Sequence, residues 1–298
     1  VDPVKDYKLC LFLGDMTLVF KSLRKYFMII ILLLLSLEFF LIKLFNHNAH
    51  LEWYELFKCL DGNLTPKSIG IIDKKILKKI LILTKFSLKF IKIFLYSTTS
   101  LMFPFSMHLV FKNIKINNLF DLFVSLLWFP PSFIMGHIVA GTITTASFTF
   151  EIICFYCWIQ IKYYNKLIDN IKDETSFGFK RFIINLKIIN IIKNQIKFSV
   201  RILKYNKFWR KFYFLFLLHI LPANIIAVQQ ILFGHLMSYQ SRILFILGAI
   251  IGIVNIISSS FIVSLLTREM KIHSEKLIHL QFLPHLNLNI NTKIKVFA

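Results

Sequence analysis

The chain has 298 residues, of which 56% are hydrophobic, and it carries 36 Lys and Arg against 15 Asp and Glu. This apolar content exceeds the roughly 45–50% of a soluble globular protein, and its several separate uncharged runs indicate a polytopic membrane protein instead. A net charge of +21 suggests a nucleic-acid partner, but most cations flank apolar runs and no zinc-finger or RNP-like pattern occurs, so none is expected.

The first long apolar run predicts a membrane-spanning helix at residues 26–45. Glu38 and Lys43 lie in its second half. Lys43 can extend to the membrane surface, whereas Glu38 is expected to face other helices. The basic residues before this run predict a cytosolic leader, and the polar residues 46–73 after it predict a loop.

Residues 74–92 alternate lysines with apolar side chains at helical spacing. This pattern predicts a helix that lies on the bilayer surface or extends a span into water. The uncharged run 93–111 follows directly and is the second predicted span. The apolar side of the amphipathic part is expected to hold Ile76, Ile80, Leu83 and Phe90.

From Leu122 to Ile161 the chain has a single charged residue in 40. At about 1.5 Å per residue, this run is roughly 60 Å long as a helix, twice the thickness of the hydrocarbon core. Two spans at 119–135 and 142–161, joined by a tight turn between Gly136 and Gly141, fit this length. The alternative is one long, kinked helix that projects from the membrane.

The segment 162–211 carries thirteen Lys and Arg and is expected to be helical and cytosolic. An uncharged pair of runs at 212–233 and 243–266 then predicts a transmembrane hairpin, the fifth and sixth spans. The apolar residues that recur at helical spacing in the basic segment are Phe182, Leu186, Ile189, Ile196, Val200 and Leu203.

Six spans place both ends of the chain on the same side of the membrane. A cytosolic N-terminus then puts 25 of the 36 Lys and Arg inside, as the positive-inside rule favours. The lysines between Lys58 and Lys89 fall on the outside in this arrangement and are its main exception.

Glu151 is the candidate ligand-binding residue, because a carboxylate deep in an apolar run is costly and usually faces a cavity or a partner. The alternative role is a buried carboxyl bonded to a neighbouring helix. No phosphate-binding loop, metalloprotease or hydrolase motif occurs, so no enzyme, cofactor or metal site is expected. Cys154 and Cys157 are expected to be small apolar helix residues, and His273 part of a solvated helix face.

Three segments resemble the seven-span arthropod chemosensory receptors of the gustatory and odorant type, especially the divergent receptor-like proteins of mites. They are Tyr163–Ile168, which closes a span, Lys204–Trp209, which leads into another, and Leu288–Lys295, which follows the sixth. The resemblance covers most of Phe148 to Ala298.

This resemblance implies a multi-pass protein of the cell membrane with a cytosolic N-terminus, acting as a tetrameric, ligand-gated cation channel for small molecules. The seventh helix of the family lines the pore, and the six spans predicted here end with a basic tail. We therefore expect the native product to continue past Ala298 with a further apolar run, and the chain as given not to conduct ions alone. The alternative function is a secondary transporter or another polytopic membrane protein.

Overall fold

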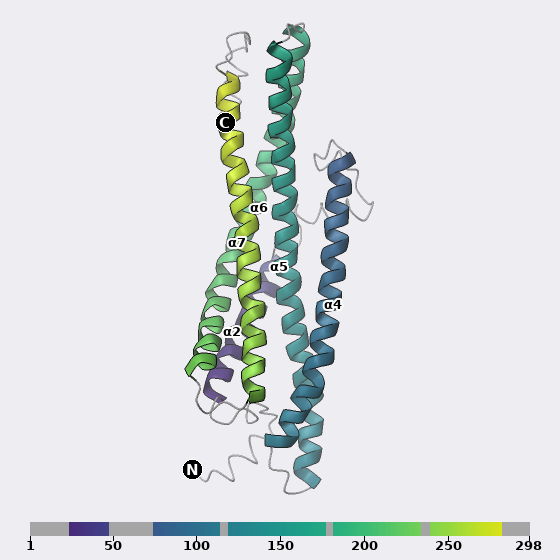
Figure 1. The fold of residues 1–298 in the computed structure, drawn as a ribbon, viewed down its shortest axis with the longest axis vertical. Helices are drawn as coiled ribbons and strands as arrows, with labels where there is room; N and C mark the ends of the chain where they lie inside the picture. The colour runs from purple at the N-terminus through teal and green to yellow at the C-terminus, as the bar shows by residue number, and fades with distance from the viewer. Residues whose placement is uncertain (1–23, 48–73, 114–118, 177–180, 234–238, 282–298) are drawn as a thin grey trace. The chain divides into compact units, whose positions relative to one another are not determined.

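The computed structural model describes residues 24–47, 74–113, 119–176, 181–233 and 239–281, all of them helical (Figure 1). They form α2 (Arg24–His47), α4 (Lys74–Asn113), α5 (Leu119–Ser176), α6 (Arg181–Phe233) and α7 (Tyr239–Gln281). The predicted all-α fold is therefore confirmed for this part of the chain. The predicted leader, most of the loop before Lys74 and the segment Leu288–Lys295 lie outside the described residues.

Four of the described helices are long and apolar enough to cross a membrane, which agrees with a helical membrane protein. The predicted span at 26–45 lies in α2, and the two runs of the predicted hairpin lie in α6 and α7. The qualifying segments are Met28–Asn46, His137–Ile171, Leu186–Phe233 and Phe245–His279.

The region 119–161 departs from the two predicted spans. Residues Leu119–Ser176 form one helix of 58 residues that continues through Pro130 and Pro131, with no turn between Gly136 and Gly141. A glycine inside a helix costs only about 1 kcal/mol relative to alanine, so tertiary contacts easily keep such a helix unbroken. The predicted segments 119–135 and 142–161 are thus both parts of α5, as the single-helix alternative has it.

The chain divides into two compact units. Unit 1 comprises Val1–Asn48, Phe86–Phe148 and Lys211–Ile257, and unit 2 comprises Ala49–Lys85, Thr149–Arg210 and Ser258–Ala298. The helices α4, α5, α6 and α7 each contribute one part to unit 1 and another to unit 2.

In unit 1, α6 and α7 pack closely through small residues. A Cβ added at Gly252 of α7 would lie 2.2 Å from the Nδ2 atom of Asn224 on α6, so a larger residue at this contact requires the Asn224 side chain to move. The next contact along α6 is a cluster in which Ala227 meets Phe245 and Ala249 of α7, with Ile30 of α2 against it. Because later residues of α6 meet earlier residues of α7, the two helices are antiparallel.

The other contacts of unit 1 join α2 to α6 and α4 to α5. His219 of α6 bonds Ser36 of α2, through Nε2 and Oγ at 3.1 Å. The rings of Phe90 and Phe148 have centroids 5.7 Å apart, and a Cβ at Gly141 would contact Leu95 at 3.9 Å. Since later residues of α4 meet earlier residues of α5, these helices are antiparallel as well.

In unit 2, α6 runs antiparallel to α5. Phe150 and Tyr164 of α5 pack on Trp209 and Phe198 of α6, at 5.3 and 5.9 Å between ring centroids. Beyond Tyr164 along α5, a cluster of buried isoleucines joins the two helices, and Leu277 of α7 packs against this cluster. Its buried members are Ile168 and Ile171 of α5 and Ile188 and Ile192 of α6.

The buried face of α4 differs in part from the one that the sequence indicated, and on α6 the recurrent apolar residues of the basic segment are not the buried ones. On α6 the buried side chains include Ile188, Ile192 and Phe198, whereas the recurrent apolar stripe from Leu186 to Leu203 is exposed. On α4, Ile76 and Ile80 are buried as expected, but Phe90 is not. The exposed members of the α6 stripe are Leu186, Ile189, Ile196, Val200 and Leu203.

Candidate functional site

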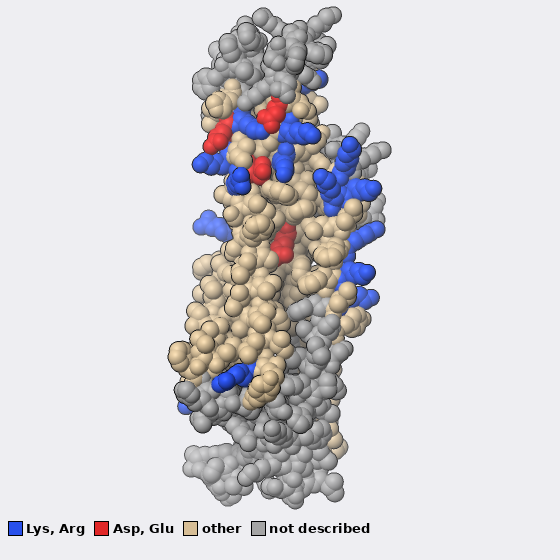
Figure 2. All heavy atoms as spheres, viewed as in Figure 1, with Lys and Arg blue, Asp and Glu red and all other residues tan. Residues whose placement is uncertain are grey.

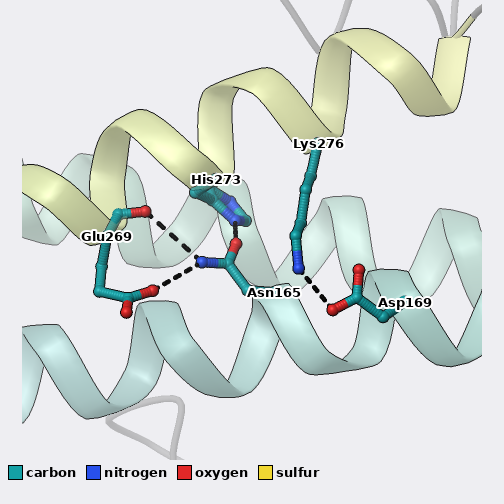
Figure 3. A network of polar contacts seen from close by, with 5 residues as sticks. All are labelled: Asn165, Asp169, Glu269, His273 and Lys276. Atoms are coloured by element: carbon teal, nitrogen blue, oxygen red, sulfur yellow. Dashed lines mark hydrogen bonds and ion pairs between the residues drawn. The ribbon is translucent and has the colours of Figure 1, made fainter.

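The densest polar contacts of unit 2 join the last third of α5 to the end of α7 (Figure 3). Asn165 and Asp169 are four residues apart on α5, so their side chains share one helix face. Glu269, His273 and Lys276 are spaced by four and three on α7 and also share a face. The earlier residue of α5 meets the earlier residues of α7, so the two helices run parallel here.

Asn165 bridges a carboxylate and an imidazole on α7. Its Nδ2 donates to Oε2 of Glu269 at 3.1 Å and also lies 3.5 Å from the carbonyl oxygen of Glu269. Its Oδ1 lies 2.6 Å from Nδ1 of His273. An amide oxygen can only accept, so Nδ1 of His273 carries a proton and donates it.

The second contact of this network is an ion pair between Lys276 and Asp169. Its side chains are 24% and 48% exposed, and a pair this exposed contributes at most about 1 kcal/mol to stability. Asn165, by contrast, is only 4% exposed. The buried amide therefore matters more than the ion pair for holding α5 against α7, because a buried polar group that loses its partner costs about 1–3 kcal/mol.

Aromatic side chains surround the bridging amide. The ring of Tyr164 lies 6.4 Å from that of His273 and 5.9 Å from that of Phe198 on α6, measured between centroids. Tyr164 is 1% exposed. It thus contacts both other helices of this part of unit 2 and restricts the rotamers of the imidazole.

Glu151, the predicted ligand-binding residue, lies on α5 at the other end of unit 2. Its Oε1 accepts hydrogen bonds from the hydroxyls of Ser258 and Ser259 on α7, the latter at 3.4 Å. The side chain is half-buried. The structure therefore places Glu151 as a contact between α5 and α7, and both of these bonds engage the same carboxylate oxygen, Oε1.

Two buried hydrogen-bond donors lie one helical turn apart between Glu151 and Asn165. Nε2 of Gln160 and Oη of Tyr164 have no hydrogen-bond partner in the described part of the chain, and both side chains are 1% exposed. Leaving a buried donor unpaired costs about 1–3 kcal/mol. An acceptor oxygen supplied there by water or by a bound molecule would satisfy them.

Reasoning from the sequence found some of these residues and missed others. His219 bonds Ser36 on a neighbouring helix, and Cys154 and Cys157 are buried free thiols, as expected of small apolar helix residues. His273 was expected on a solvated face, but it bonds Asn165.

Asn165 and Glu269 were not predicted as site residues. The four–three spacing of Glu269, His273 and Lys276 was a usable signal for one helix face, but it names no partner on α5.

Among the described residues, no group of three His, Cys, Asp or Glu side chains is placed to hold a metal ion. No protein-family model, no curated protein and no solved structure matches the chain.

Proposed function

We propose that this chain is a chemosensory receptor-like membrane protein, a subunit of a tetrameric, ligand-gated cation channel that binds small molecules. The observation that carries the proposal is the Asn165 bridge, which ties α5 to α7 in unit 2 by hydrogen bonds to Glu269 and His273. A receptor needs such a connection between helices, because ligand binding must shift an equilibrium between two packings. The resemblance of Phe148 to Ala298 to the gustatory and odorant receptors supports the same function.

Within this proposal, Glu151 responds to the ligand. Its carboxylate accepts bonds from Ser258 and Ser259, and a ligand bearing an amine or hydroxyl donor would compete with these serines for it. Release of the serines would then loosen α7 from α5. Glu151→Gln keeps the shape but removes the charge, so we expect a weaker ligand response at near-normal surface expression. A lower folded yield with an unchanged response per molecule would assign Glu151 a structural role only.

A secondary transporter is the second candidate, and helix continuity disfavours it. Transporters of the inverted-repeat type bind substrate at helices that are interrupted near mid-membrane. The prolines that could mark such breaks, Pro130, Pro131 and Pro222, lie inside continuous helices α5 and α6. Discontinuous helices are thus absent from these two positions in the described part of the chain.

The single helix α5 also changes the proposed orientation. If α4, which carries the second predicted span at 93–111, crosses once in addition to the four qualifying helices α2, α5, α6 and α7, the two ends of the chain lie on opposite sides. The basic segment 162–211 and the tail after residue 266 then share one side with the residues before the run 93–111. That side holds nine Lys between Lys58 and Lys92, thirteen Lys and Arg in the basic segment and five in the tail, or 27 of 36.

We therefore propose that this basic side is cytosolic and that the N-terminal leader is extracytosolic, contrary to the orientation that six spans predict and that the resemblance implies. The antiparallel packing of α4 on α5, through Phe90 and Phe148, supports it, because antiparallel neighbours place the start of α4 on the side where α5 ends.

Thiol labelling of intact cells tests the orientation. In a chain with Cys10 and Cys59 replaced by Ser, we expect Lys25→Cys to react with an impermeant thiol reagent. Lys79→Cys and Lys271→Cys should react only after permeabilisation. All three positions are exposed. Labelling of Lys79→Cys but not Lys25→Cys on intact cells would reverse the orientation, and labelling of Lys79→Cys but not Lys271→Cys would break the five-crossing arrangement.

Electrical recording tests the function. The full-length product of the transcript, expressed in a heterologous cell, should give cation currents when a panel of small molecules is applied. Uptake of a small molecule without current would favour the transporter, and neither current nor uptake would leave the receptor proposal without support. The charge-neutral variant Glu151→Gln serves in the same cells as the internal comparison.

A further inference from the structure

The outward face of α4 mixes cations with large apolar side chains. Six lysines are exposed on it, and Ile82, Phe86, Phe90 and Ile93 are exposed among them at 59, 66, 47 and 54%. Figure 2 shows the blue side chains gathered along α4. We call this set the lysine face of α4; its lysines are Lys75, Lys78, Lys79, Lys85, Lys89 and Lys92.

The opposite face of the same helix is buried. Ile76, Ile80, Thr84, Ser87 and Ile91 recur every three or four residues and are at most 8% exposed. At 3.6 residues per turn, these positions fall on one side of α4, and the lysine face falls on the other. The buried side of α4 thus fixes the orientation of this helix, and the exposed side chains of Lys85, Phe86, Lys89 and Lys92 lie away from it.

The composition of the lysine face indicates which kind of partner it can bind. α4 contains no Asp or Glu from Lys74 to Asn113, so the lysines have no acidic neighbour on their own helix. A second copy of the same face would set lysine against lysine. Purely aqueous surroundings would leave Phe86 and Ile93 in water. A surface with negative charges above an apolar layer satisfies both kinds of side chain.

The position of the face in the chain points to a bilayer. The uncharged run 93–111 begins directly after Lys92, within the same helix. The ammonium of Lys92 lies 5.9 Å from the centre of the Tyr96 ring, and Tyr96 is 64% exposed. Aromatic rings and lysines at the start of an apolar run are typical of the headgroup level of a membrane. A cluster of four to eight cations beside such a run attracts anionic lipids.

We propose that the lysine face of α4 binds the anionic lipid headgroups of the leaflet on the basic side of the membrane. Lys85, Lys89 and Lys92 lie within about 12 Å of Ile93 along the helix, at 1.5 Å per residue, and contact the headgroup phosphates and carboxylates. Phe86 reaches toward the acyl boundary beside them. The leaflet assignment rests on the proposed orientation, whereas the lipid preference itself does not.

Spin-labelled lipids test this binding in reconstituted bilayers. The full chain is placed in phosphatidylcholine membranes that contain trace spin-labelled phosphatidylserine or phosphatidylcholine, and the fraction of motionally restricted label is measured. We expect the wild type to prefer phosphatidylserine, and the preference to decrease as salt rises. The triple variant Lys85→Gln, Lys89→Gln, Lys92→Gln should lose most of it, since each lysine at the surface contributes up to about fivefold.

A matched variant removes the same charge elsewhere. Lys187, Lys193 and Lys197 are exposed lysines of α6 that lie at least 15 residues before the uncharged run 212–233, and their change to Gln should leave the preference for phosphatidylserine intact. Equal losses in the two triple variants, or no preference in the wild type, would overturn the proposal. Unchanged helix content and thermal midpoint establish that each variant is folded. Because the two leaflets of these bilayers have the same composition, the lipid preference does not depend on the proposed orientation. An error in the orientation would appear only in the thiol labelling.

Discussion

The two units use the same helices but hold them together by different physics. In unit 1, α6 and α7 approach through Gly252 and small residues such as Ala227 and Ala249, the packing that favours helix association within lipid. In unit 2, α5 and α7 are joined by Asn165 and its hydrogen bonds to Glu269 and His273. The helix α7 thus packs through small residues in unit 1 and through polar side chains in unit 2, where its sequence becomes charged.

The largest expected effect comes from charging the bridge in unit 2. Asn165→Asp replaces the amide that donates to Glu269 by a second carboxylate in a buried position. An uncompensated buried charge costs about 3 kcal/mol or more, so the free energy of unfolding should fall by about this amount. Titration with denaturing detergent measures it, with Asn190→Asp on α6 as the exposed control. Adding Glu269→Gln to the Asn165→Asp variant should restore part of the lost stability. If it restores none, residues 165 and 269 do not form the contact described here.

The second-largest loss of stability is expected at the close contact between α6 and α7 in unit 1. Gly252→Ala brings a methyl group to within 2.7 Å of three side-chain atoms of Asn224, whose Nδ2 also donates to the carbonyl oxygen of Ile220. Asn224 must move and lose that bond, so we expect a loss of about 2 kcal/mol. Gly248→Ala is the matched control, because nothing lies within 4 Å of its added Cβ. It should be neutral or slightly stabilising, since alanine favours helix. Equal effects of the two variants would mean that α6 and α7 do not approach at Gly252.

A smaller effect is expected where the carboxylate of Glu151 is held. Ser258→Ala removes one of the two hydroxyls that donate to Oε1, and a hydrogen bond to a charged group contributes about 1.5 kcal/mol. Because Ser259 remains in reach, we expect a loss nearer 1 kcal/mol. The exposed Ser264→Ala should have no effect on thermal stability. A Ser258→Ala protein as stable as the wild type would remove Glu151 from the contacts that join α5 to α7.

The smallest effect is expected for a neutral bond in unit 1. Ser36→Ala removes the hydroxyl that bonds Nε2 of His219; Nδ1 of that ring donates to the carbonyl oxygen of Leu215. Hydrogen bonds between membrane helices contribute about 0.6 kcal/mol on average, so the loss should be close to this value. Ser147→Ala is the control, since its hydroxyl donates to Ile143 in its own helix. If Ser36→Ala lowered the free energy of unfolding more than Asn165→Asp does, polar contacts between helices would matter more in unit 1 than in unit 2.

The sequence by itself determined that the chain is helical and that its apolar runs are long enough to cross a membrane. Backbone polar groups in lipid must be satisfied within a helix, so an uncharged run such as Phe212–Phe233 leaves few alternatives. It also determined that the cations of 162–211 gather beside a span. It did not determine which face of that segment is buried, because isoleucines recur on more than one side of α6.

Tertiary structure decided the rest. Gly136 and Gly141 permit a turn but do not require one, and only the packing of α5 shows that residues 119–176 form one helix. The bridge of Asn165 to Glu269 and His273 joins residues more than 100 positions apart, and helical spacing on either segment names no partner on the other. Local periodicity sets which side chains share a face, whereas the choice of facing helix depends on how all the faces are buried together.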